Sequence, residues 1–146
     1  MNDSDHLSEL RSLVSDLRDD LIRQSEEDSD IAAELEARHA EEQAKDRTAD
    51  SFAAWRERFT EQVAVAWVLT TIFVRYMEDN GLVDVVRIAG PKDRQREIED
   101  QWRQFLADRE APSEADYLLH IFRDFADMPA GALFGPERNF LYEMPI

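Results

Sequence analysis

The sequence contains no cysteine, and it has neither glycine nor proline before Gly81 and Pro91. Without cysteine the chain has no disulfide framework, no thiolate metal site and no cysteine nucleophile. Glycine and proline are the residues that most strongly interrupt helices, so their absence predicts that roughly the first half of the chain is helical.

Basic side chains are also scarce. The 146 residues include 33 acidic and 17 basic ones, for a formal net charge of −16, and residues 1–50 alone hold 16 acidic and 6 basic side chains. Such a surface repels a phosphate backbone, which argues against direct, non-specific nucleic-acid binding by this chain. A protein partner with a basic face is compatible with it.

No segment has the features of a membrane or export signal. The N-terminus is acidic and lacks the basic-then-apolar pattern of a signal peptide. The uncharged run 63–74 has twelve residues, short of the roughly 20 needed to span a bilayer. We therefore expect a cytoplasmic protein with no membrane partner, and we interpret residues 63–74 as a core helix buried on all sides.

Apolar periodicity predicts an all-α fold of about five helices. We expect an acidic helical hairpin over residues 1–48, a helical core bundle over 49–127 and an apolar loop over 128–146. Ser29 or Asp30 is expected to cap the second helix of the hairpin, and Gly81 to end the long core helix.

Three shorter signals follow the core helix. Residues 83–89 are short, apolar and β-branched, which favours an extended segment over a helical turn. Gly90 and Pro91 are expected to be the cap and first position of the next helix. The run 113–116 (Ser-Glu-Ala-Asp) is similar to a capping box.

The first helix carries an apolar seam with spacings of 3, 4, 3 and 4 residues. The seam consists of Leu7, Leu10, Val14, Leu17 and Leu21. Two interpretations stay open: packing on neighbouring helices of the same domain, or the seam of a homodimer.

Candidate catalytic groups are few. His39 has acidic neighbours but no second imidazole one turn away, so we expect a solvated charged face and not a metal site. Glu78 and Asp79 are expected to be a solvated helix-terminal pair that Arg75 bridges. His120 is expected to be a partly buried structural histidine. No catalytic, cofactor-binding or metal-binding residue is predicted.

One basic cluster stands out against the acidic background. It consists of Arg87, Lys92, Arg94 and Arg96. It is either the solvated start of a helix or a docking point for DNA phosphate or an acidic partner.

Several motifs together carry a family resemblance. They are Ala64-Val-Ala-Trp-Val-Leu, Phe73-Val-Arg-Tyr-Met-Glu-Asp-Asn-Gly-Leu82, Arg87-Ile-Ala-Gly-Pro91, Pro129-Ala-Gly-Ala-Leu-Phe134 and Asn139-Phe-Leu-Tyr142. The chain resembles the N-terminal region of the PglX family, the adenine-specific DNA methyltransferases of phage-growth-limitation, or BREX type 2, defence systems.

The resemblance implies a protein that methylates adenine N6 in DNA with S-adenosylmethionine, to mark self DNA in anti-phage defence. It also implies a helical N-terminal region followed by a methyltransferase domain, to which the apolar loop 128–146 would lead. The family's Asn-Pro-Pro-Tyr type motif and cofactor-binding glycine motif are absent here. The fragment is therefore expected to be a non-catalytic scaffold and interaction domain.

The partners implied are the chain's own methyltransferase domain, other defence-system proteins or a phage inhibitor, with DNA bound only weakly or through the parent protein. The alternative interpretation is a stand-alone acidic interaction protein, or a DNA mimic that occupies a DNA-binding enzyme.

Overall fold

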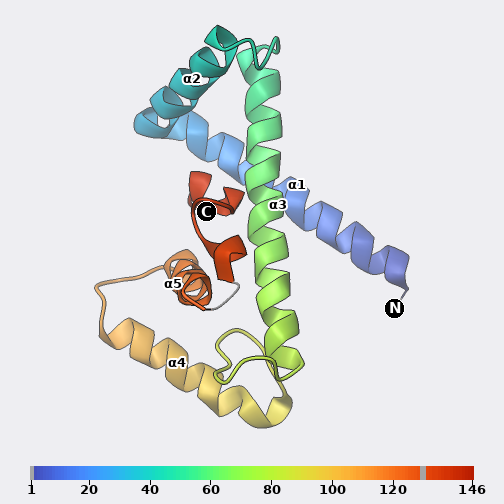
Figure 1. Ribbon diagram of the computed structural model, residues 1–146, viewed down its shortest axis with the longest axis vertical. Coiled ribbons are helices and arrows are strands. Elements are labelled where there is room, and N and C mark those ends of the chain that lie inside the picture. The colour runs from blue at the N-terminus through green and yellow to red at the C-terminus, as the bar shows by residue number, and fades with distance from the viewer. Residues whose placement is uncertain (1, 129–130) are drawn as a thin grey trace. The chain divides into compact units, whose positions relative to one another are not determined.

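The computed structural model describes residues 2–128 and 131–146 (Figure 1). Within these ranges the fold is all-α, as the sequence predicts, and no strand is present. The helices are α1 (Asp3–Glu27), α2 (Ser29–Ala44), α3 (Phe52–Asp79), α4 (Gln95–Ala107) and α5 (Glu114–Ala126), with short 3-10 turns at η1 (Lys92–Arg94), η2 (Gly131–Phe134) and η3 (Phe140–Glu143). None of the described helices is both long and apolar enough to cross a membrane.

The chain forms two compact units. Residues 2–68 and Phe140–Ile146 make up the first, and the described residues of Leu69–Asn139 make up the second, so that α3 contributes to both. These limits differ from the expected boundaries at residues 48 and 127, because the first half of α3 packs with α1 and α2. The division into three functional segments stays a prediction.

Helices α1 and α2 belong to the first unit, follow each other with only Asp28 between them and meet at an angle; they are the two helices of the acidic hairpin that the sequence predicts (Figure 1). The residue that caps α2 is Asp28, whose side chain accepts hydrogen bonds from the backbone of Asp30 and Ile31, so the expected cap at Ser29 or Asp30 is wrong. Leu21 and Leu35 are buried. The guanidinium of Arg56 in α3 lies 3.1 Å from the carboxylate of Glu26 in α1.

The C-terminal residues of the chain pack into this first unit. Leu141 and Met144 are almost fully buried. The indole Nε1 of Trp67 donates to the carbonyl of Met144 at 3.1 Å, and the ring of Phe140 meets that of Phe59 edge-on. The apolar residues expected in a loop therefore form a short 3-10 turn with a core role. Pro129 and Ala130, which belong to the resemblance, lie outside the described residues.

The second unit starts with the second half of α3. Gly81 has a φ of +67°, and the amide of Leu82 donates to the carbonyl of Met77 at 2.9 Å. This is the glycine stop that the sequence predicts. An apolar contact between the residue after the glycine and the helix often accompanies such a stop and would be expected of Leu82, but its side chain is 63% exposed and does not fold back onto the helix.

The segment between α3 and α4 departs from expectation. Residues 83–89 form neither a strand nor a helical turn, and Pro91 precedes a 3-10 turn instead of being the first residue of an α-helix. Side chains distant in sequence fix this loop, which a local signal cannot reveal.

Helix α5 begins with the predicted capping box. The hydroxyl of Ser113 accepts from the amide of Asp116 at 3.1 Å, and the amide of Ser113 donates to the Asp116 carboxylate at 2.8 Å. These hydrogen bonds to Ser113 hold the pKa of Asp116 below its ordinary value.

Replacing Ser113 by alanine is therefore expected to lower the free energy of unfolding by about 1 kcal/mol. The pKa of Asp116 is lower in the folded chain than in the unfolded chain. The carboxylate therefore stabilises the fold at pH values above its unfolded pKa, and this stabilisation is lost as pH falls through its folded pKa. Urea unfolding at pH 7 and pH 3 measures both effects. If Ser113→Ala lowered the free energy of unfolding equally at pH 7 and pH 3, the Asp116 carboxylate would have no part in the capping box.

Candidate functional site

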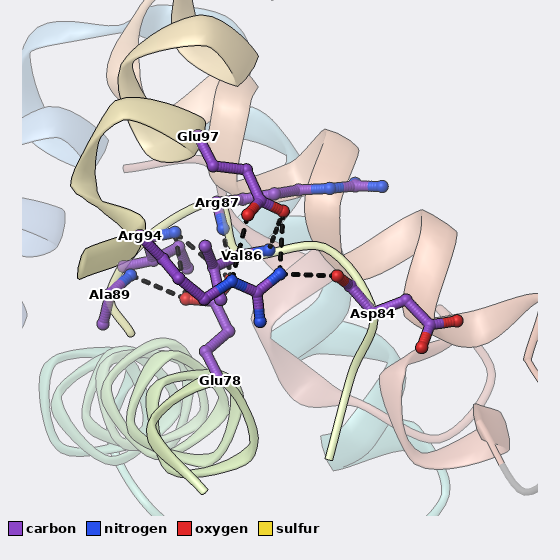
Figure 2. Close-up of polar contacts among 8 residues, drawn as sticks. Glu78, Asp84, Val86, Arg87, Ala89, Arg94 and Glu97 are labelled. Carbon is purple, nitrogen blue, oxygen red and sulfur yellow. Dashed lines mark hydrogen bonds and ion pairs between the residues drawn. The ribbon is translucent and has the colours of Figure 1, made fainter. Parts of the chain in front are cut away.

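The most organised polar arrangement in the second unit surrounds the buried carboxylate of Glu78 (Figure 2). This side chain, at the end of α3, is fully buried. It accepts hydrogen bonds from the backbone amides of Arg87 at 2.6 Å, Ile88 at 3.1 and 3.2 Å, and Ala89 at 2.6 Å. One carboxylate thus holds three consecutive amides of the loop.

Two more carboxylates extend this arrangement on either side. Asp79 accepts from the amide of Gly90 at 2.9 Å. Glu97, which reaches the loop from α4, accepts from the amide of Val86 at 3.2 Å (Figure 2). The amides of residues 86–90 are therefore all bound by carboxylates, and we call this segment the carboxylate-bound loop.

Gly90 closes the carboxylate-bound loop in a conformation that few other residues adopt. Its φ is +115°, and a Cβ atom there would lie 2.9 Å from Cγ1 of Val86. A run of consecutive amides is a typical anion-binding arrangement. Here the protein's own carboxylates fill it, so the loop is a structural element and not a free anion site.

Arg94 ties the loop to α4. Its guanidinium donates to the Glu97 carboxylate at 2.9 and 3.0 Å and to the carbonyl of Asp84 at 2.6 Å. In Figure 2 it lies between these two residues. Charge-assisted bonds of this kind are stronger than neutral ones, and through Arg94 they link Asp84, within the segment between α3 and α4, to Glu97 of α4.

The expectation that Glu78 and Asp79 form a solvated pair is wrong for Glu78, which is buried, and Asp79 binds the backbone of Gly90 instead of Arg75. A signal was available in the sequence. Val63, Trp67, Thr70 and Val74 form the buried side of α3, and Glu78 continues their spacing of three and four residues. A carboxylate on a buried stripe must have partners, although the sequence does not say which.

The four predicted basic residues do not form one free cluster. Arg94 belongs to the loop arrangement described above. Arg87 pairs with Asp124 of α5 at 2.5 Å, and its carbonyl accepts from the hydroxyl of Tyr117 at 3.1 Å; burial raises the pKa of that hydroxyl. Lys92 and Arg96 are exposed. Contact between these residues and DNA or a partner stays a prediction, now for Lys92 and Arg96 above all.

A polar pocket of about 240 Å³ lies beside Arg87, between α4 and α5. Its lining residues include Arg109, whose guanidinium lies 4.0 Å from the centre of the Phe105 ring. His120 lies 3.5 Å from Arg109 and 3.7 Å from Asp124, and it is partly exposed. No cysteine, serine or threonine lines this pocket.

His39 is not on a solvated face, contrary to expectation. It is 8% exposed, its Nε2 lies 2.9 Å from the carbonyl of Asp50, and its ring centre is 5.6 Å from that of Phe52 and 5.5 Å from that of Trp55. It joins α2 to the start of α3. Among the residues that the structure describes, no group of three or more histidine and carboxylate side chains is placed to hold a metal ion.

The apolar seam of α1 is buried only towards its C-terminal end. Leu21 is 1% exposed and Leu7 is 49% exposed, while Leu10, Val14 and Leu17 are intermediate. In Figure 1 the first part of α1 extends beyond α3. The described fold therefore uses one end of the seam as core and leaves the other end available for a second copy.

If the seam forms a dimer, replacing both Leu10 and Leu17 by aspartate is expected to convert a dimer to a monomer, because four carboxylates would enter the interface. Light scattering gives the molar mass. Replacing the exposed Ala33 and Ala53 by aspartate adds the same charge elsewhere and is the control. An unchanged molar mass for Leu10→Asp/Leu17→Asp would show that the seam does not form a dimer.

The described residues do not fit S-adenosylmethionine, the cofactor that the resemblance implies for the parent protein. The four glycines are spread over residues 81–135, and no strand precedes any of them in the described part. A glycine-rich turn between a strand and a helix is what such a nucleotide pocket requires. No step of methyl transfer can be derived from these residues.

One comparison with known proteins gives a match. The chain is 32% identical over 142 residues, 96% of its length, to the adenine-specific methyltransferase PglX of Streptomyces coelicolor. The chain spans 12% of the length of that protein. Comparison with protein families and with solved structures finds no match. The resemblance predicted from the sequence is therefore confirmed, and the chain is related to a methyltransferase.

Proposed function

We propose that this chain, which is similar to PglX over nearly its whole length, is the N-terminal helical scaffold and interaction domain of a PglX-like adenine-specific DNA methyltransferase in BREX defence. The observation that carries the proposal is the 32% identity over 96% of the chain. In this proposal the chain is not itself catalytic, since its sequence contains neither an Asn-Pro-Pro-Tyr type motif nor a glycine-rich cofactor motif.

The positions of the family motifs support a scaffold role. The run 73–82 supplies Glu78 and Asp79, and the run 87–91 supplies the amides that these carboxylates bind. The two motifs are thus the two sides of one structural arrangement. Glu78 and Asp79 hold the carboxylate-bound loop, and no catalytic role is required to account for these two carboxylates.

The proposal places methylation of adenine N6 and the binding of S-adenosylmethionine in the part of a PglX-like protein that lies outside the matched region. That part would be the first partner of this domain. Other defence proteins or a phage inhibitor would meet its acidic hairpin, where the excess of carboxylates favours a basic surface.

The first test is to determine the gene sequence beyond codon 146. A reading frame that continues into an Asn-Pro-Pro-Tyr motif agrees with the proposal, and a stop codon there contradicts it. The second test is to delete the region equivalent to this chain from the full PglX-like protein and to measure N6-methyladenine in host DNA. We expect methylation to be lost, and full methylation without the region would count against a scaffold role.

The alternative is a stand-alone DNA mimic, which the net charge of −16 favours. Such a mimic should displace DNA from a basic enzyme, and its affinity should fall steeply with salt. A competition assay between 50 and 200 mM salt separates the two functions, because a scaffold domain is not expected to displace DNA.

Replacement of Lys92 and Arg96 by alanine tests the remaining basic residues in the full PglX-like protein. If both contact phosphate, the slope of log affinity for DNA against log salt concentration is expected to fall by about 2. Alanine at Arg11 and Arg103, which are also exposed, is the matched control. An unchanged slope would remove these residues from the DNA interface.

A further inference from the structure

One side of the second half of α3 is apolar and exposed. Leu69, Ile72, Phe73 and Tyr76 are 57%, 38%, 49% and 58% exposed. Their spacing of i, i+3, i+4 and i+7 places them on a single face. The expectation that this helix is buried on all sides is therefore wrong for this face.

The apolar surface continues onto η2. Leu133 is 66% exposed. The amide group of Asn139 donates to the hydroxyl of Thr70 at 2.9 Å and to the carbonyl of Leu133 at 3.1 Å, which brings this turn beside α3. We call Leu69, Ile72, Phe73, Tyr76 and Leu133 the α3 apolar face; all five belong to the second unit.

Only a small part of the α3 apolar face packs within its own unit, where the ring centre of Phe73 lies 5.7 Å from that of the buried Phe134. The opposite side of the helix already supplies the core through Val74 and Glu78, which are fully buried. Charged residues make up 34% of the chain, yet the only one between Leu69 and Tyr76 is Arg75, about 100° around the helix axis from Tyr76. Contiguous exposed apolar patches mark interaction sites, and a helix with this spacing is a common recognition element.

We propose that the α3 apolar face is the surface on which the methyltransferase part of a PglX-like protein packs. This inference rests on the proposed function. The matched region is 12% of the length of PglX, so most of such a protein lies outside it and is available to cover the face.

Charge favours the methyltransferase part over three other candidates for this face, which are a second copy of the chain, a basic protein and nucleic acid. A second copy would bring together two chains of net charge −16 through a face that carries no cation to offset the repulsion. A basic partner would prefer the acidic hairpin, and nucleic acid requires cations that the α3 apolar face lacks. An uncharged, apolar protein surface is the chemistry that fits.

The absence of cysteine from the chain provides the experiment. Cysteine introduced as Tyr76→Cys is the only thiol of the 146-residue chain, and Leu106→Cys, at an α4 position that is 38% exposed, is the control. Each variant is labelled with a thiol reagent, both in the 146-residue chain and in the full PglX-like protein, and labelling at that residue is followed by mass spectrometry.

Both cysteines are expected to react freely in the 146-residue chain. In the full protein we expect labelling of Tyr76→Cys to slow by at least about tenfold, because interface cores exclude water, and labelling of Leu106→Cys to stay the same. Equal labelling of Tyr76→Cys in both proteins overturns the inference and leaves the proposed function standing. A gene that does not continue into a methyltransferase overturns both.

Protection of Tyr76→Cys in the 146-residue chain, with a doubled mass by light scattering, would assign the face to a second copy and overturn the inference.

A second pair of variants tests the inference without thiol labelling. In the full protein, Leu69→Glu/Tyr76→Glu is expected to speed protease cleavage between the two parts by at least about thirtyfold. Ala33→Glu/Leu106→Glu, which adds the same charge at exposed positions, is expected to leave cleavage unchanged, and equal rates for the two variants would contradict the inference.

Discussion

Replacement of Glu78 by alanine is expected to lower the free energy of unfolding by on the order of 3–5 kcal/mol. The buried carboxylate accepts from the amides of Arg87, Ile88 and Ala89. Without it, three backbone donors lose their partners inside the protein, and a cavity replaces the side chain. A loss of this size is a large fraction of the stability of an ordinary domain.

Urea unfolding followed by circular dichroism gives the change in free energy. Hydrogen exchange locates it, and amides of the carboxylate-bound loop are expected to exchange fastest. Glu78→Gln keeps the shape but offers one acceptor oxygen instead of two, so an intermediate loss is expected. Asp79→Ala, which frees the single amide of Gly90 at an exposed position, is expected to cost no more than about 1.5 kcal/mol. Equal costs for Glu78→Ala and Asp79→Ala would contradict the special role of the buried carboxylate.

Replacement of Trp67 by alanine is expected to cost about 3–5 kcal/mol in the first unit. The indole is 2% exposed, and its Nε1 donates to the carbonyl of Met144 at 3.1 Å. Loss of the ring removes a large apolar contact and also the hydrogen bond that holds the C-terminal residues. We expect a lower urea midpoint and faster amide exchange in Phe140–Ile146.

Trp67→Phe separates the two contributions. It keeps an aromatic ring in the core but removes the donor, so a smaller cost of about 1–2 kcal/mol is expected, together with the faster exchange near Met144. Trp102→Ala is a control in the second unit, where the indole is only partly buried. If Trp67→Ala leaves exchange in residues 140–146 unchanged, the C-terminal segment does not depend on this contact.

The fold gives a structural role to several residues of the family motif 73–82 that have no catalytic role. The run 73–82 contains the carboxylates, a glycine stop with φ +67° and two members of the α3 apolar face. Its residues face two ways. Inward, Glu78 binds the loop; outward, Phe73 and Tyr76 offer a surface to a partner in the proposed function.

Much of the helical architecture could be predicted from the sequence because its causes are local. The absence of glycine and proline before residue 81, the periodicity of leucine in α1 and the Ser113–Asp116 capping box each act within a few residues of the chain. The glycine stop at Gly81 is equally local, since a left-handed residue is needed where the helix ends. The relation to PglX could likewise be predicted, because it depends on residue identities and not on their arrangement.

Contacts between residues far apart in the chain decided the rest. The sequence places Glu78 beside Asp79 in a charged run, and only the tertiary structure shows that one is buried against amides nine to eleven residues later while the other is exposed. The tertiary structure also decided that Arg87 and Arg94 form ion pairs within the second unit. It buries His39 against Phe52 and Trp55, and it leaves one apolar side of α3 exposed. Local propensity fixes which segments are helices, but burial depends on which surfaces meet, and that is a property of the folded chain as a whole.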